Sequence, residues 1–182
     1  LRKILAHKTA LFIHKHVVSN LRKPLMEIEK GFKIDNPNVF IPWNITENEL
    51  IEILDGNELK NVTNGYYGMS CESLNGLKCY IGFHFNPRKN GILNELEFFR
   101  NGTDSQIKSF DKFQFHFERE FGKATKISKG KEGFENYEWW INGIQIVHFV
   151  FDRFGPEEHM RIRNKVRTHN SVFKKMLKGM FK

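Results

Sequence analysis

The sequence has no long apolar run and lacks the motifs that mark common catalytic sites. Its longest apolar stretches, such as residues 10–13 and 145–151, are too short to cross a bilayer. There is no phosphate-binding loop ending in Gly-Lys-Ser/Thr, no His-Glu-x-x-His zinc helix and no Gly-x-Ser-x-Gly nucleophile turn. The basic N-terminus has no apolar core of a secretion signal, so we expect no signal peptide. These absences predict a non-catalytic protein without a cofactor.

Cysteine is scarce, with two in 182 residues. Cys71 and Cys79 flank Asn75-Gly76, a dipeptide typical of a two-residue hairpin turn. In that register Cys71 faces Tyr80 across the hairpin, so the two thiols point to opposite faces of the ribbon and cannot be bridged. We therefore expect free thiols and, from them, a reducing, cytoplasmic location.

Apolar residues are plentiful and charge is distributed unevenly. They make up 40% of the sequence, with 18 phenylalanines, which excludes a disordered chain and fits one domain with a buried core. Residues 1–33 hold eight Lys/Arg and two Glu, and residues 161–182 hold eight Lys/Arg and no acid. Residues 34–160 hold 13 Lys/Arg against 19 Asp/Glu. The net charge of +8 therefore comes from the ends, while the middle is acidic.

This charge pattern and the hydrophobic periodicity divide the chain into three segments. Residues 2–22 have a loose apolar stripe at helical spacing that ends at Pro24. We predict a basic N-terminal helical segment over 1–33, an α+β body over 34–163 and a basic amphipathic tail over 164–182.

Two helices are predicted inside the body. The first begins at a capping box formed by Thr46 and Glu49, and Gly56 ends it. The second spans about 109–121 and stops at Gly122, with phenylalanines at spacings of three and four on one face. These phenylalanines are Phe110, Phe113, Phe117 and Phe121.

Each helix is followed by alternating apolar and polar residues that predict an antiparallel meander. Gly56 and Phe85 recur as Gly122 and Phe151 at a shift of 66 residues, which suggests an internal repeat over 44–100 and 105–163. The predicted fold class is α+β, with two α-plus-antiparallel-meander units sharing an antiparallel sheet and with N-terminal and C-terminal helices. The predicted strands are 66–74, 77–85, 92–100, 137–141, 144–151 and 159–163.

This order resembles a known architecture. A capped helix ending in glycine, then a meander whose middle strand reads Phe-x-Phe before a turn, occurs twice over residues 44–163. It is similar to the tandem helix-plus-sheet layout of the β-lactamase inhibitor protein fold. The Phe-Gly-Lys helix ending and the strands rich in Trp and Phe also resemble small bacterial immunity proteins that neutralise toxins. Both resemblances imply a non-enzymatic protein that binds other proteins.

The strands of the first meander alternate between one apolar and one polar face. The core face takes Ile81, Phe83, Phe85, Leu96 and Phe98. The opposite face takes Tyr80, His84, Glu95 and Glu97. We predict that this acidic face binds a basic partner protein, as in an immunity or inhibitor protein.

Trp139 and Trp140 lie next to each other and therefore point to opposite faces of a strand. We expect one to be buried and the other to be an exposed anchor for a partner.

The basic ends support an alternative function. Apolar pairs in the tail recur at helical spacing, and four lysines lie between or beside them: Lys174, Lys175, Lys178 and Lys182. A basic amphipathic helix of this kind binds nucleic acid, an anionic membrane or a partner groove, or docks its apolar stripe on the protein's own acidic body.

Histidines offer one further possibility. His148 and His159 with a nearby carboxylate form a conceivable metal site, although histidines in strands more often fill half-exposed positions. We therefore expect no metal.

Overall fold

The computed structural model describes residues 27–86, 91–100, 105–131, 133–152 and 156–165. Most of these residues are in strands. The strands are β1 (Gly31–Asn36), β2 (Val39–Pro42), β3 (Lys60–Thr63), β4 (Tyr66–Ser73), β5 (Leu77–Asn86), β6 (Ile92–Arg100), β7 (Lys126–Lys129), β8 (Glu135–Ile141), β9 (Ile144–Asp152) and β10 (Pro156–Asn164). The helices among the described residues are α2 (Glu47–Ile53) and α3 (Gln106–Phe121).

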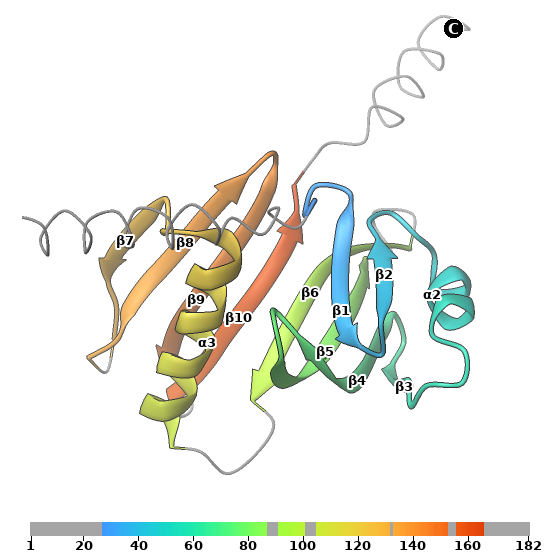
Figure 1. The fold of residues 1–182 in the computed structure, drawn as a ribbon, viewed down its shortest axis with the longest axis horizontal. Helices are drawn as coiled ribbons and strands as arrows, with labels where there is room; N and C mark the ends of the chain where they lie inside the picture. The colour runs from blue at the N-terminus through green and yellow to red at the C-terminus, as the bar shows by residue number, and fades with distance from the viewer. Residues whose placement is uncertain (1–26, 87–90, 101–104, 132, 153–155, 166–182) are drawn as a thin grey trace, which may run out of the picture.

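The ten strands form one antiparallel sheet in the order β2-β1-β4-β5-β6-β10-β9-β8-β7, with β3 paired to β4 (Figure 1). The antiparallel sheet is confirmed, but the predicted fold class is wrong. The described part of the chain is mainly β, with helices of only seven and 16 residues, and not two α+β units. Strands β3 and β7 are exposed at every position, so they lack the alternation on which the prediction depended.

The predicted terminal helices lie outside the described residues, and so do Lys174, Lys175, Lys178 and Lys182. The boundary predicted at residue 33 falls inside β1, which pairs with both β2 and β4. Neither helix of the described chain is long and apolar enough to span a membrane.

One face of the sheet, here called the inner face, is covered by α3 and by the β1–β2 hairpin, which lie on the same side (Figure 1). Phe98 on β6 links the two covers, because its ring packs edge-on against Phe32 of β1 and against Phe117 of α3. The core predicted for this face is confirmed by burial. Its predicted members are Ile81, Phe83, Phe85, Leu96 and Phe98.

Helix α3 follows its predicted phase. The Ser105 side chain accepts a hydrogen bond from the Lys108 backbone at the N-terminus, and Gly122 ends the helix with a φ of 75°. The four phenylalanines of the predicted stripe are all buried. In α2 the capping box of Thr46 and Glu49 is also confirmed.

The β4–β5 turn is placed correctly, but its register is wrong by one residue. Ser73 pairs with Leu77, so the turn contains Leu74, Asn75 and Gly76, all with positive φ. Leucine rarely adopts this conformation, which is why the sequence favours a shorter turn. The extra turn residue moves β4 by one position relative to β5, and Cys71 lies directly opposite Cys79.

Strands β6 and β10 meet at the centre of the sheet. Their register runs from Phe98 opposite Met160 to Glu95 opposite Arg163. They join residues more than 60 positions apart in the sequence, and this junction positions the candidate site.

Candidate functional site

The candidate site lies on the outer face, the side of the sheet opposite α3 and the β1–β2 hairpin. No helix of the described residues lies on this face. Strand alternation places the four predicted residues of the first meander there, each one position away from a core residue. These are Tyr80, His84, Glu95 and Glu97.

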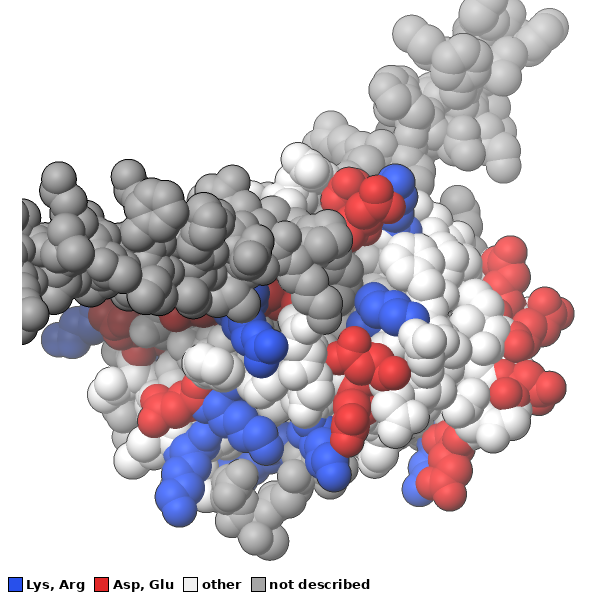
Figure 2. Space-filling view, viewed as in Figure 1, with Lys and Arg blue, Asp and Glu red and all other residues white. Residues whose placement is uncertain are grey.

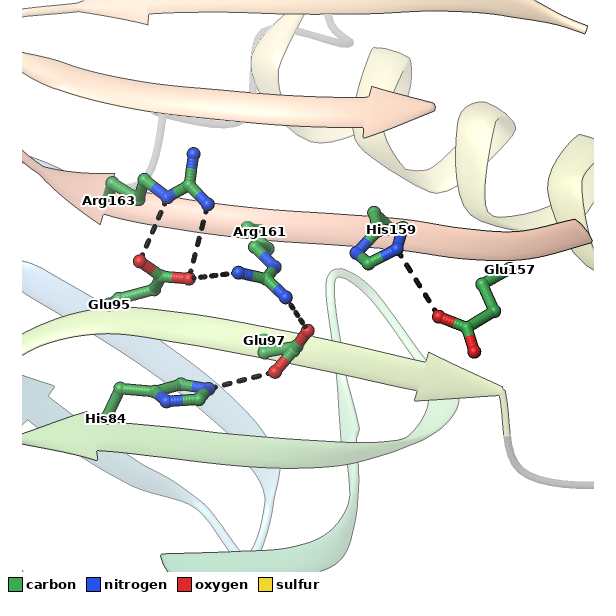
Figure 3. Close-up of polar contacts among 7 residues, drawn as sticks. All are labelled: His84, Glu95, Glu97, Glu157, His159, Arg161 and Arg163. Atoms are coloured by element: carbon green, nitrogen blue, oxygen red, sulfur yellow. Dashed lines mark hydrogen bonds and ion pairs between the residues drawn. The ribbon is translucent and has the colours of Figure 1, made fainter. Parts of the chain in front are cut away.

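A network of five charged or polar side chains crosses the outer face from β5 to β10 (Figure 3). Glu97 accepts hydrogen bonds from His84 Nε2 at 2.9 Å and from Arg161 Nη2 at 2.5 Å. Arg161 Nη1 also donates to Glu95 at 3.0 Å, and Arg163 Nε donates to the other oxygen of Glu95 at 2.9 Å. We call these five residues the outer ladder.

The register of β6 and β10 creates this ladder. Glu97 lies directly opposite Arg161, and Glu95 lies directly opposite Arg163. Opposite charges at facing positions stabilise an antiparallel pair. The two glutamates that the sequence predicts on an acidic face are therefore each bonded to arginine, which offsets their negative charge.

The outer ladder is held in a partly desolvated environment. Burial alone would raise the pKa of Glu97, which is only 8% exposed. The hydrogen bond from His84 and the charge of Arg161 outweigh burial and hold the pKa of this carboxyl below its ordinary value. Glu97 is therefore a fixed anion at neutral pH.

Two tyrosines lie flat beside the ladder. The ring of Tyr66 covers Gly82 and stacks on His84 with ring centroids 4.4 Å apart, while Tyr80 covers Gly68. A Cβ atom at either glycine would collide with the tyrosine above it, so both rings need glycine beneath them. Burial, and then the charge of Glu97, raise the pKa of Tyr66 to about 12, so it stays a neutral hydrogen-bonding group.

A hollow of about 500 Å³ opens at one end of the outer ladder. Pairing between β6 and β10 ends at Phe98 and Met160, while β6 continues to Arg100. The hollow lies around this end of the pairing, because its lining includes the pair Glu97 and Arg161 and also Arg100 and Glu157 beyond the last pair. Its walls include aromatic rings and both signs of charge: Tyr66, Phe99 and His159, with Glu97, Glu157 and Arg161.

Glu157 is the exposed carboxylate at this hollow. Its side chain is 64% exposed, and its ionic contact is a 3.7 Å approach to His159 (Figure 3). Burial, and next the charge of Arg161, lower the pKa of His159 below its ordinary value. His159 is therefore neutral at pH 7 and does not itself neutralise Glu157, whose hollow is also lined by Arg100 and Arg161.

The adjacent tryptophans separate as the sequence predicts. Trp139 is buried on the inner face, where its Nε1 donates to the Gly122 carbonyl at 2.8 Å. Trp140 is 48% exposed on the outer face. One strand separates it from the outer ladder, because Gln145 of β9 faces Trp140 on one side and Arg163 on the other.

His148 and His159 do not form a common site. His148 lies on the inner face, where it contacts Gln114 and Glu158 at 2.9 Å each. His159 lies on the outer face and stacks on Phe149, with centroids 5.2 Å apart. Within the described residues, no group of three or more His, Cys, Asp or Glu side chains could hold a metal ion.

The side of the molecule that carries α3 and α2 has a different charge pattern. Figure 2 shows acidic side chains along the edge formed by α2, and Lys and Arg over the α3 half. The acids of α2 include Glu47 and Glu49 in its first turn.

Several outer-face residues were not predicted from the sequence. Arg161 and Arg163 alternate with core residues in β10, which would have indicated the outer face. Their pairing with Glu95 and Glu97 depends on β10 lying next to β6, which no local pattern predicts.

No protein-family model and no curated protein matches this chain. Among solved structures, it is similar to a DUF4309 family protein, YjgB from Bacillus subtilis. The two share 11% sequence identity and a TM-score of 0.37, over 66% of this chain and 78% of the other. A TM-score this low carries no argument about fold or function.

Proposed function

We propose that this chain is a non-catalytic protein-binding module that uses the outer face of its sheet. The observation that carries the proposal is the hollow beside the outer ladder, where aromatic walls surround the exposed carboxylate of Glu157. Interfaces are built from such combinations of apolar anchors and oriented polar groups.

Exposed aromatic side chains continue along the same face. Phe99, Phe151 and Trp140 are large, exposed and located on β6, β9 and β8. Aromatic residues contribute most of the binding energy in many interfaces because they bury a large area at low conformational cost. The hydrogen-bonded ladder between them provides a rigid surface on which a partner needs little rearrangement.

The partner that fits the hollow presents a basic side chain. An ammonium or guanidinium group placed there is attracted by Glu157 and by the faces of Tyr66 and Phe99. Arg161 does not repel it strongly, because its charge is already shared between Glu95 and Glu97, and Arg100, which also lines the hollow, is exposed to solvent. An inhibitor-type or immunity-type role against a basic protein, in the cytoplasm, is the form of this function that we propose.

The test compares capture of a partner by the full wild-type chain and by single variants. We expect a partner that loses at least tenfold affinity with Glu157→Gln and with Phe99→Ala. Phe115→Ala and Glu52→Gln are matched controls, because Phe115 is 61% exposed on α3 and Glu52 is exposed on α2. A partner whose affinity is unchanged by both outer-face variants would overturn the proposal.

A defined probe tests the chemistry of the hollow separately. The peptide Gly-Gly-Arg-Gly-Gly should shift the NMR signals of the Tyr66 and Phe99 rings in the wild-type chain, and less so in Glu157→Gln. An equal response to Gly-Gly-Glu-Gly-Gly would contradict selectivity for a cation.

The basic tail remains the alternative binding element. Changing Lys174, Lys175, Lys178 and Lys182 to Glu tests it directly. If these changes abolish binding to nucleic acid or anionic vesicles while Phe99→Ala has no effect on any partner, the function belongs to the tail.

A further inference from the structure

The two cysteines form a facing pair inside the β4–β5 hairpin. Cys71 lies directly opposite Cys79, and their Sγ atoms are 3.8 Å apart. Both are free and buried, and the Ser73 hydroxyl lies 3.5 Å from the Cys79 sulfur. The sequence predicts the reverse, with the thiols on opposite faces, so this pair exists only because of the longer turn.

The backbone geometry permits a bond between them. Directly opposed residues in an antiparallel pair have Cα atoms about 4.5 or 5.5 Å apart. Both values lie inside the range of about 4.4 to 6.8 Å found for disulfides. The two sulfurs therefore need only side-chain rotation, and no shift of the strands, to reach each other.

The surrounding structure keeps the two thiols in register. His116 of α3 donates from Nδ1 to the Leu74 carbonyl at 2.7 Å, and the Gly76 amide donates to Asp35 of β1 at 3.1 Å. Asn75 also donates to Glu120 of α3. The hairpin tip is thus attached to two other elements, which limits sliding of β4 along β5.

The pair also has one member suited to react first. A hydrogen bond from Cys71 is the main cause that lowers the pKa of Cys79 below its ordinary value. The pKa of Cys71 is raised, because its thiol donates to Cys79 and a second thiolate beside the first is disfavoured. Cys79 is therefore the thiol that ionises first, and the thiolate is the reactive form.

We propose that Cys71 and Cys79 are a redox modification site that closes to an intramolecular disulfide when the protein meets hydrogen peroxide. Two S–H bonds and the O–O bond break and one S–S bond forms. The thiols lose two electrons and two protons, and the peroxide gains them to become two waters. A dithiol reductant such as dithiothreitol reverses the modification by thiol–disulfide exchange.

The disulfide links β4 to β5 without using any residue of the outer ladder or the hollow. It restricts the unfolded chain by closing a short loop, so it raises the melting temperature of the protein. This inference does not rest on the proposed function, and either can fail alone.

The experiment treats the full native chain with a small excess of hydrogen peroxide, with glutathione in a parallel tube to show that the oxidant is active. We expect a mass loss of about 2 Da in the intact protein and a linked peptide pair containing both cysteines. Thiol titration after denaturation should fall from two to none, and dithiothreitol should restore both. The melting temperature of the oxidised form should be higher.

Cys71→Ser and Cys79→Ser are the controls, and each should gain oxygen or remain unchanged rather than lose mass. A wild-type protein that gains about 16 or 32 Da without a crosslink would overturn the proposal. Retention of both thiols while glutathione is oxidised would also overturn it. These readouts use the wild-type chain, so they hold even if a variant folds poorly.

Discussion

His84 and His148 each contact a glutamate at 2.9 Å, but they do so on opposite faces of the sheet. His84 is 34% exposed on the outer face, and its partner Glu97 is also bonded to arginine. His148 is fully buried beneath α3, and its partner Glu158 accepts a further hydrogen bond from Ser109. Two chemically similar pairs thus have different environments.

This difference in burial determines how much each pair contributes to the stability of the fold. The ring of His148 lies within 4.0 Å of the Phe110 ring centroid and is also surrounded by Phe113 and Phe117. The charged form of a histidine surrounded by apolar rings in this way is disfavoured. On the outer face, Arg161 and Arg163 compensate the charges of the two glutamates, and these arginines are partly exposed, so the outer ladder contributes less to stability.

The largest expected effect on stability comes from removing a buried ring on the inner face. Phe117→Ala should lower the free energy of unfolding by about 3 kcal/mol, because the buried ring contacts Phe98, Trp139 and His148 and leaves a cavity. Chemical denaturation measures this. Phe115→Ala on the exposed side of α3 is the control and should cost less than about 0.5 kcal/mol. A loss below about 1 kcal/mol for Phe117→Ala would contradict the packing.

An intermediate effect is expected at His148. His148→Gln should cost about 2 kcal/mol near pH 7.5, because Glu158 and Gln114 both lose a buried partner. Burial lowers the pKa of His148, although Glu158 opposes it. The folded state therefore resists protonation that the unfolded chain accepts.

The stabilising contribution of neutral His148 depends on pH. It is fully present above pH 6.5, the ordinary pKa of histidine, and it is lost as pH falls through the lower pKa of His148 in the folded state. Denaturation at pH 7.5 and 5.5 should show stability falling with acid, and the slope should shrink in His148→Gln. Phe115→Ala leaves every titratable group in place, so its slope should match the wild type. Equal slopes in all three proteins would remove His148 as the cause.

The smallest effect is expected on the outer face. Glu95→Lys should cost about 1 kcal/mol, because it places a like charge opposite Arg163 in a partly exposed pair. Adding Arg163→Glu should recover part of the loss in a double-mutant cycle. Glu157→Lys, at an exposed position, should leave stability nearly unchanged. A cost for Glu95→Lys as large as that of Phe117→Ala would make the two faces equivalent.

Local patterns predicted several parts of this molecule. The phase of α3, the capping box at Thr46, the hairpin positions and the core face of β5 and β6 all followed from residue spacing. The outer-face position of Tyr80 and His84 and the separation of Trp139 and Trp140 onto opposite faces followed from the same alternation. These features depend on neighbours within one helix or one hairpin.

Other parts could not be predicted in this way. Strands β3 and β7 are exposed and short, so no periodicity marks them. The one-residue register of the β4–β5 hairpin depended on Leu74 adopting a positive φ, which is unusual for leucine. That single residue decided whether Cys71 faces Tyr80 or Cys79.

By itself, the sequence determined which side chains share a strand face or a helix face, because alternation and helical periodicity are properties of the local backbone. Only the tertiary structure decided which strands are neighbours. Placing β10 beside β6 turned Glu95 and Glu97 from an expected acidic surface into an ion-paired ladder with Arg161 and Arg163. Such pairing depends on the whole sheet, since these charges meet across more than 60 residues of chain.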